Sequence, residues 1–136
     1  MKVNVLPTSK DFVLPKKAEG HQMDFCYDVT AVSEEEIAPG IWKYSLGFAA
    51  QICREEVDRF KDYILDIDFR PRSSVWKTGM VLSNCEGTID EIFTGTISAV
   101  FYKVIPDGIP YQGGVIERYH KGDRIGQIKI GITVPM

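Results

Sequence analysis

The residues best suited to bind phosphate groups stand in one short run in the middle of the chain. Arg72, Ser73 and Ser74 follow a proline at the end of a segment with the alternation of a β-strand. A guanidinium group donates paired hydrogen bonds to phosphate oxygens, and two hydroxyls with free backbone amides add neutral donors. The same residues also suit a surface turn in which the arginine forms a salt bridge. From these residues alone both interpretations stay open, and the surface turn is the more frequent case.

A carboxylate, Asp90, lies further along the chain, in a stretch framed by Gly87 and Gly95. The apolar Ile89 should face inward, so Asp90 should point to the opposite side of its strand. A carboxylate held rigidly there could activate a water molecule as a general base. The alternative is an aspartate that accepts backbone hydrogen bonds in a turn. Asn84 adds a carboxamide group just before this stretch.

Two further carboxylates belong to segments that could support such a site. Asp28 lies within an apolar, strand-like segment, where a charge is costly unless it is paired or hydrogen-bonded. It could therefore anchor a loop or orient water molecules around a metal ion. Asp123 and Arg124 are expected to form an ion pair that closes a turn rather than a catalytic pair.

Short β-strands separated by turns are expected to position these groups. From Tyr63 to Phe69 apolar and charged residues alternate, which predicts a half-buried strand that leads into Arg72. Met80–Leu82 and Thr88–Ile89 flank turn-forming residues and predict a hairpin. Further strands are expected near residues 3–5, at 24–31, on either side of Gly47 in 41–52, at 96–105 in a central position, at 115–119 and at 127–134.

One segment has the period of a helix. Val57, Phe60 and Ile64 fall on one face of residues 54–64, with charged residues elsewhere. Residues 33–36 and 106–114 are expected to be surface loops. Many short strands, one brief helix and no βαβ alternation together predict a single all-β domain over residues 1–136, an antiparallel sandwich or barrel.

The overall composition argues against several classes of function. Hydrophobic residues make up 44% and charged residues 26% of the chain, as in ordinary globular proteins. The net charge of −3 gives no support to a nucleic-acid partner. No apolar run approaches the ~20 residues needed to cross a membrane, and the first residues lack the apolar centre of a signal peptide. With three cysteines at no metal-like spacing, we expect reduced thiols and a cytoplasmic protein.

Four stretches, taken together, resemble the motifs of the trimeric deoxyuridine triphosphate nucleotidohydrolases, the dUTPases. They occur in the order of the family and cover most of the chain, with the first motif matched more loosely than the others. They are Tyr27–Ala31, Pro71–Ser74 followed by Lys77–Gly79, Asn84–Asp90 continuing to Phe93 and Gly95, and Gly122–Gln127.

The resemblance implies a jelly-roll-like antiparallel fold that assembles as a homotrimer, with active sites built between subunits. Asp90 would be the general base that activates the attacking water. The Arg72 run and the Asp90 stretch would serve different active sites of the trimer, each completed by a neighbouring subunit.

The resemblance also assigns binding roles to two groups of residues. The first group would hold phosphate oxygens, and the second would recognise uracil and pack on the deoxyribose. The ring of Phe93 would leave no room for a 2′-hydroxyl. The first group is Arg72, Ser73, Ser74 and Gln127, and the second is Asn84, Gly87, Thr88, Ile89 and Phe93.

The implied reaction is attack of water on the α-phosphorus of dUTP, which gives dUMP and pyrophosphate. In the family, Mg²⁺ is carried by the triphosphate and keeps several of its waters, as this ion prefers. Asp28 would contact the ion through water. The protein would contribute positioning and charge stabilisation rather than a covalent intermediate.

The chain departs from the family pattern in three ways. Phe93 stands where the family usually has tyrosine, although an aromatic ring is enough to exclude a ribose hydroxyl. Arg54–Lys61 and Pro106–Gly114 are longer than usual. A glycine-rich fifth motif, which closes over the phosphates, is not found in the 136 residues. Because such a lid excludes water and adds phosphate contacts, we expect lower turnover without it.

Other functions are compatible with part of the same pattern. A dUTPase-like nucleotide-binding protein with weak or no turnover could act as a sensor or bind a regulatory protein. The missing fifth motif favours it, and Asp90 argues against it. A dCTP deaminase shares the fold and the Gly-x-Ile-Asp element but needs a glutamate soon afterwards, and residues 95–102 contain none. An unrelated β-sandwich that matches four motifs by chance is the least favoured alternative.

Overall fold

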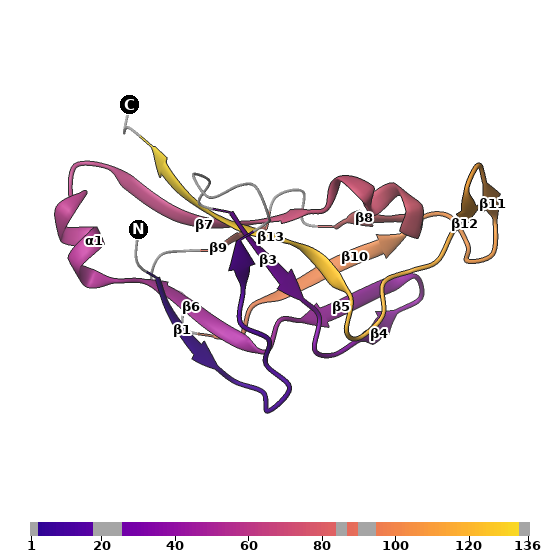
Figure 1. Cartoon of the computed structure of the whole chain (residues 1–136), viewed down its shortest axis with the longest axis horizontal. Helices are drawn as coiled ribbons and strands as arrows, with labels where there is room; N and C mark the ends of the chain where they lie inside the picture. Colours follow the sequence, from indigo (N-terminus) through magenta and orange to yellow (C-terminus); the bar gives the residue numbers. More distant parts are fainter. Residues whose placement is uncertain (1–2, 18–25, 84–86, 90–94, 134–136) are drawn as a thin grey trace.

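The computed structural model describes residues 3–17, 26–83, 87–89 and 95–133 of the chain (Figure 1). Within these ranges the strands pair in antiparallel fashion and form two larger and two smaller sheets. The short helix α1 (Arg54–Arg59) and the hairpin of β11 (Pro110–Tyr111) and β12 (Gly114–Val115) lie at opposite ends of the molecule. The predicted all-β class with one short α-helix is confirmed, as packed sheets rather than a closed barrel.

The five-stranded sheet has the order β2–β3–β13–β7–β9. Its long central pair is in register from the Ile64–Thr133 pair to the Pro71–Gly126 pair. Every second residue of β7, namely Leu65, Ile67 and Phe69, is buried, which confirms the alternation predicted for this strand. The strands are β2 (Lys16–Lys17), β3 (Cys26–Thr30), β13 (Arg124–Thr133), β7 (Ile64–Pro71) and β9 (Gly87–Ile89).

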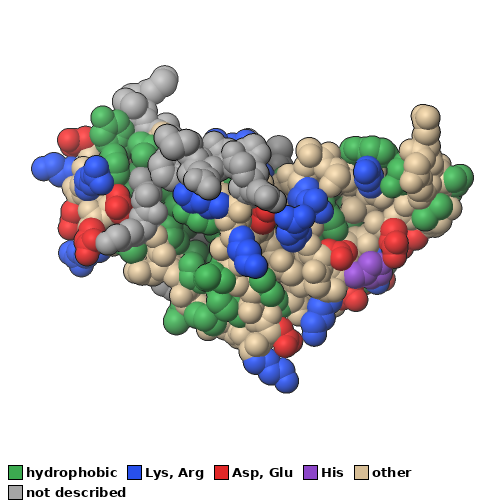
Figure 2. Space-filling model, in the orientation of Figure 1, with side chains coloured by type: hydrophobic (Ala, Val, Ile, Leu, Met, Phe, Trp, Pro, Cys, Tyr) green, Lys and Arg blue, Asp and Glu red, His purple; other side chains and the backbone are tan. Residues whose placement is uncertain are grey.

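The opposite face of this sheet is polar. Lys16, Asp28, Gln127 and Arg70 occupy one row across β2, β3, β13 and β7. Residues directly opposite each other in antiparallel strands place their side chains on the same face. Lys and Arg side chains accordingly gather over β3 and β13 in Figure 2. The sheet thus brings two predicted site residues, Asp28 and Gln127, next to each other.

The second large sheet has the order β4–β5–β10–β8 and supplies the other side of the core. Tyr44 and Phe101 are fully buried, and the ring of Phe69 from the first sheet meets Phe101 edge to face, with centroids 6.2 Å apart. The hydrophobic core therefore lies between the two sheets. The strands are β4 (Glu35–Ala38), β5 (Ile41–Ser45), β10 (Ser98–Lys103) and β8 (Met80–Leu82), and β1 (Val3–Pro7) pairs separately with β6 (Phe48–Ile52).

The helix is shorter than the sequence pattern predicts. α1 ends at Arg59, and Ile64, expected on the helix face, is instead the first residue of β7. The prediction of a helix as far as Ile64 is therefore wrong. Ile64 instead pairs with Thr133 of β13, so its backbone belongs to the five-stranded sheet. No helix in the described ranges is both long and apolar enough to cross a membrane.

The hairpin predicted around residues 84–87 is also wrong. β8 pairs with β10, and β9 pairs with β7, so the two strands belong to different sheets. Met80 is 2% exposed and packs in the core between the sheets, which holds β8 in the second sheet. β8 and β9 therefore do not pair with each other as the two strands of a hairpin.

Two segments expected as loops contain short strands. Glu35 and Glu36 belong to β4, opposite Lys43 and Trp42 of β5. The region 106–114 folds into the β11–β12 hairpin, and the strand expected at 115–119 reaches only Val115. The sequence pattern did not indicate β4, because this edge strand exposes most of its side chains and so lacks the alternation of a half-buried strand.

Candidate functional site

A pocket of about 440 Å³ opens where β7 leads into the 3-10 helix η1 (Ser73–Thr78). Its walls come from η1 and the residue before it, from the β11–β12 hairpin, and from the segment that leads into β13. Arg and Lys side chains outnumber carboxylates among them. The lining residues are Arg72, Ser74, Lys77, Thr78, Tyr111, Val115, Glu117, Arg118, Tyr119, His120, Asp123 and Arg124.

The backbone around η1 fixes how Arg72 enters the pocket. Arg72 is extended (φ −66°, ψ 151°), and its carbonyl accepts a hydrogen bond from the N–H of Val75 at 3.0 Å. Gly79 ends the helix with φ +65°, and a Cβ at this position would lie 2.5 Å from the carbonyl oxygen of Ile105. Because no side chain fits there, glycine sets where η1 stops.

Arg72 and Lys77 form no ion pair with any residue that the structure describes. The ammonium group of Lys77 lies 5.6 Å from the centre of the Trp76 ring. Ser74 lines the pocket with Arg72, whereas Ser73 is exposed and does not line it. Two of the three phosphate-binding residues predicted in this run therefore share one pocket, with positive charge available to an anionic ligand.

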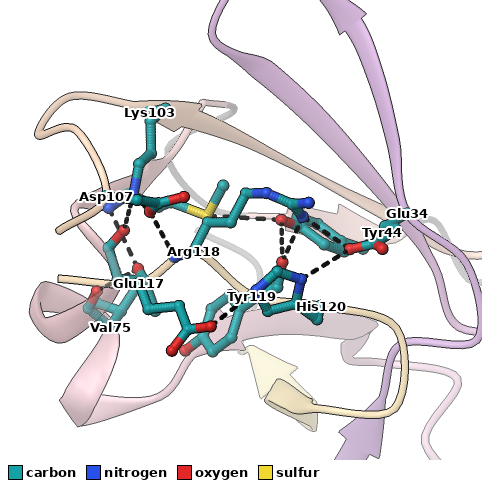
Figure 3. Close-up of polar contacts among 11 residues, drawn as sticks. Glu34, Tyr44, Val75, Lys103, Asp107, Glu117, Arg118, Tyr119 and His120 are labelled. Atoms are coloured by element: carbon teal, nitrogen blue, oxygen red, sulfur yellow. Dashed lines mark hydrogen bonds and ion pairs between the residues drawn. The ribbon is translucent and has the colours of Figure 1, made fainter. Parts of the chain in front are cut away.

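Arg118 forms a wall of the pocket that the sequence pattern did not indicate (Figure 3). Its Nη1 donates hydrogen bonds to Glu34 Oε2 (2.7 Å) and to the carbonyl of Tyr119 (3.0 Å), and its guanidinium lies 3.8 Å from the centre of the Trp42 ring. The hydrogen bond from Arg118 lowers the pKa of Glu34. Arg118 is thus neutralised within the chain. The sequence feature that could have pointed to Arg118 is the run of cationic and aromatic residues just before Gly122.

Asp107 joins this wall to η1 (Figure 3). It forms an ion pair with Lys103, whose Nζ also donates to the carbonyl of Thr78 at 2.6 Å, and it accepts the backbone N–H of Arg118 at 2.9 Å. Burial alone would raise the pKa of Asp107, but these hydrogen bonds and charges lower it. The region 106–114 therefore braces two walls of the pocket.

Asp123 and Arg124, at the turn before β13, were expected to form an ion pair with each other but contact other residues instead. The carboxylate of Asp123 accepts the backbone N–H of His120 at 2.8 Å, while Arg124 pairs with Asp28. Asp123 and Arg124 do not pair with each other, so that prediction is wrong. The His120 ring lies between two carboxylates, with Nδ1 3.4 Å from Glu34 and Nε2 3.2 Å from Glu117.

Asp28 is the centre of a compact cluster that borders the pocket. Gln127 Nε2 donates to Asp28 Oδ1 at 3.0 Å, and Arg124 Nη1 lies 3.1 Å from Asp28 Oδ2. The Asp28 side chain is 16% exposed, and these partners offset the cost of a charge in the strand. Because Arg124 also lines the pocket, the cluster adjoins the Arg72 site.

The residues present fit an indirect contact with Mg²⁺. No group of three or more His, Cys, Asp or Glu within the described ranges could hold a metal ion. Both oxygens of Asp28 already accept a hydrogen bond, but a carboxylate has about four acceptor positions. Asp28 can therefore accept a hydrogen bond from a metal-bound water without losing Arg124 or Gln127.

The strand β9, which carries three of the expected uracil- and deoxyribose-binding residues, runs away from the pocket. Residues 87–89 pair with residues 69–67 of β7, so β9 runs away from Arg72. Ile89 lies opposite Ile67, which precedes Arg72 by five residues, about 16 Å along the strand. Three other predicted site residues lie outside the described residues, namely Asn84, Asp90 and Phe93.

Comparison by sequence finds no relative: neither a known family model nor a curated protein matches the chain. Solved structures do match. A dUTPase variant from phage phi11 of S. aureus, described with a structural Mg(II) ion, superposes with a TM-score of 0.71 at 18% identity, over 100% of this chain and 93% of the other.

Two structures of the Staphylococcus bacteriophage 80alpha dUTPase are similar in the same way. One variant has a TM-score of 0.70 at 18% identity, over 99% of this chain and 92% of the other. Another, with dUpNHpp, has a TM-score of 0.67 at 19% identity, over 99% of this chain and 84% of the other. The antiparallel sheets described above, with their single short α-helix, thus have the fold of the phage dUTPases.

Proposed function

We propose that the protein binds dUTP and hydrolyses it to dUMP and pyrophosphate. The observation that carries the proposal is the pocket at the end of β7, where Arg72 has no ion-pair partner among the described residues and Ser74 shares its wall. This pocket belongs to a fold shared with dUTPases, one of them described with dUpNHpp.

The contacts of each residue support a separate part in phosphate binding. Arg72 would donate paired hydrogen bonds to phosphate oxygens, and the hydroxyl of Ser74 and the exposed Ser73 would add neutral donors. Gln127 uses one of its two amide hydrogens on Asp28, and the other would donate to a phosphate oxygen. Asp28 would therefore orient Gln127 and hold one water of Mg²⁺, which would neutralise charge on the triphosphate.

The remaining roles follow from the resemblance of the motifs. Asp90 would accept the proton of the water that attacks the α-phosphorus, as a general base. Gly87, Thr88 and Ile89 of β9, which β7 holds in register, would recognise uracil together with Asn84. Phe93 would pack on the deoxyribose.

The position of β9 supports a homotrimer with shared active sites. β9 runs away from Arg72 along β7, from Gly87 opposite Phe69 to Ile89 opposite Ile67, so its far end points away from the pocket of its own chain. A neighbouring subunit would supply that strand. A molecular mass of a monomer in solution, measured by light scattering, would contradict this arrangement.

A regulatory role is the alternative of a different class. The 80alpha dUTPase is described as controlling the transfer of virulence genes by a G protein-like mechanism, and this chain shares its fold. A nucleotide-binding protein of this kind would need the same pocket but no turnover.

The deciding experiment measures pyrophosphate release from dUTP with Mg²⁺. The wild-type protein should release pyrophosphate, and Asp90→Asn should reduce the rate by about 100-fold or more, since general-base catalysis contributes 10²–10⁴. Asp58→Asn, an exposed aspartate on α1 at the far end of the molecule, is the matched control and should behave as wild type.

Two results would contradict the proposal. Nucleotide binding by the wild-type protein without any pyrophosphate release would favour the regulatory alternative. Release of ammonia from dCTP would instead show deaminase chemistry.

A further inference from the structure

The hydroxyl of Tyr119 is a buried polar group without a partner. The residue is 5% exposed, and its hydroxyl oxygen forms no hydrogen bond with any residue in the described part of the chain. Leaving such a group unsatisfied is unfavourable, so native structures rarely keep one without a reason.

A neighbouring tyrosine shows the usual outcome. Tyr44 is fully buried and packs against Tyr119, with ring centroids 6.3 Å apart. Its hydroxyl donates a hydrogen bond to the Tyr119 carbonyl at 2.8 Å (Figure 3). The two tyrosines lie in the same part of the core, yet only the Tyr119 hydroxyl lacks a hydrogen-bond partner among the described residues. Because Tyr119 is one of the residues that line the pocket, a ligand bound there is the candidate for the missing partner.

The charges around the Tyr119 hydroxyl favour an anion as that partner. Burial is the largest influence and raises the pKa of Tyr119, the charge of Arg72 acts to lower it, and the charge of Asp123 acts to raise it. The hydroxyl therefore keeps its proton at neutral pH and can donate. Arg72 and Lys77 line the same pocket without ion-pair partners among the described residues.

We propose that the Tyr119 hydroxyl is a phosphate-binding group, which donates a hydrogen bond to a phosphate oxygen held by Arg72. A neutral donor beside a guanidinium suits a tetrahedral oxyanion, because the two donors approach different oxygens of one phosphate group. Tyr119 lies in none of the motif stretches. The identity of the ligand as a nucleotide triphosphate rests on the proposed function, while the anion site rests on the pocket.

The test compares the binding of inorganic tripolyphosphate to the wild-type protein and to Tyr119→Phe by isothermal titration calorimetry. Hydrogen bonds to charged groups contribute about 1.5–3 kcal/mol, so affinity should fall about 10- to 100-fold in the variant. The melting temperature without ligand should stay unchanged or rise, because the variant removes a hydroxyl that bonds to nothing.

Tyr44→Phe is the matched control, since it removes a hydroxyl from the same core. It should lower the melting temperature, because a buried hydrogen bond to the Tyr119 carbonyl is lost. Its affinity for tripolyphosphate should stay close to that of the wild type. Tyr119→Phe should therefore lower affinity but not stability, and Tyr44→Phe should lower stability but not affinity.

Three results would overturn the inference. The first is tripolyphosphate affinity in Tyr119→Phe equal to that of the wild type. The second is no binding of tripolyphosphate to the wild type. The third is a lower melting temperature together with a smaller molecular mass for Tyr119→Phe, which would assign the hydroxyl to a subunit interface.

The inference and the proposed function fail in different ways. Weaker tripolyphosphate binding by Tyr119→Phe, with no release of pyrophosphate from dUTP by the wild type, would keep the anion site and reject the hydrolase. Hydrolysis of dUTP by the wild type with an unchanged KM in Tyr119→Phe would keep the hydrolase and reject the role of Tyr119.

Discussion

The Asp28 cluster and the Arg72 pocket adjoin each other, yet the charged side chains are paired in the cluster and Arg72 and Lys77 are not paired in the pocket. Asp28, Arg124 and Gln127 satisfy one another within the chain. Arg72 and Lys77 line a concave pocket without ion-pair partners among the described residues. A charge that is paired inside the chain serves the fold first, whereas an unpaired cation in a pocket is available to a ligand. Substitutions in the two places should therefore differ in kind.

The largest expected effect is on ligand binding, at Arg72. Arg72→Ala should weaken tripolyphosphate binding by about 100-fold, because a bidentate, charge-assisted pair of hydrogen bonds is lost. The melting temperature should change little, since Arg72 has no ion-pair partner among the described residues. Arg124→Ala should weaken binding by less than about 10-fold, because the side chain is 57% exposed and already paired with Asp28. Calorimetric titration and thermal unfolding measure both quantities.

Two controls make this comparison specific. Arg54→Ala removes an exposed arginine on α1, at the end of the molecule away from the pocket, and should leave binding unchanged. Arg72→Lys keeps the charge but not the forked donor, so it should recover only part of the affinity. A larger loss of affinity in Arg124→Ala than in Arg72→Ala would show that the paired Arg124, and not the unpaired Arg72, contributes most to anion binding.

The second effect is on stability, at the residue that ends η1. The positive φ of Gly79 is strained for alanine, which costs about 1–3 kcal/mol. A Cβ would also overlap the Ile105 carbonyl, so Gly79→Ala should lower the free energy of unfolding by more than the backbone strain alone. Tripolyphosphate binding should weaken as well, since η1 carries Ser74 and Lys77. The measurement is urea-induced unfolding.

Gly108→Ala separates the two causes of this loss. Gly108 has φ +90°, but a Cβ at this position would have no other atom within 4 Å, so only the backbone strain remains. The variant should lose less stability than Gly79→Ala and keep its affinity. Equal losses in both variants would mean that the close contact with Ile105 contributes nothing.

Local patterns in the sequence predicted some parts of the structure and not others. The alternation of Leu65, Ile67 and Phe69 predicted β7, because a half-buried strand must place every second side chain in the core. The turn residues after Leu82 predicted a hairpin, which was wrong, because β8 pairs with β10 and its Met80 packs in the core. Pairing of distant strands depends on such packing, which no short window of sequence contains.

The candidate site divides in the same way. Arg72 and Ser74 were found because residue types in one run suggest phosphate chemistry. Arg118 and Tyr119 were missed because their function depends on what they meet: Glu34 for the guanidinium of Arg118, and no described partner for the hydroxyl of Tyr119. A satisfied and an unsatisfied polar group look identical in a sequence, so only the structure separates them.

The smallest expected effect concerns pH and the paired wall of the pocket. The pKa of Glu34 is lower in the folded protein than its ordinary value of 4.5, chiefly because Arg118 donates a hydrogen bond to it. The unfolded chain therefore binds a proton more readily, and the stabilisation from Glu34 is complete above pH 4.5 and is lost as pH falls through the lower folded value. In Glu34→Gln, the free energy of unfolding should decline less steeply than in the wild type over this acidic range, and Glu35→Gln, which alters an exposed neighbour, should follow the wild type. Parallel curves for the wild type and Glu34→Gln would show that Arg118 needs no internal partner, and would place it with Arg72 among the cations available to a ligand.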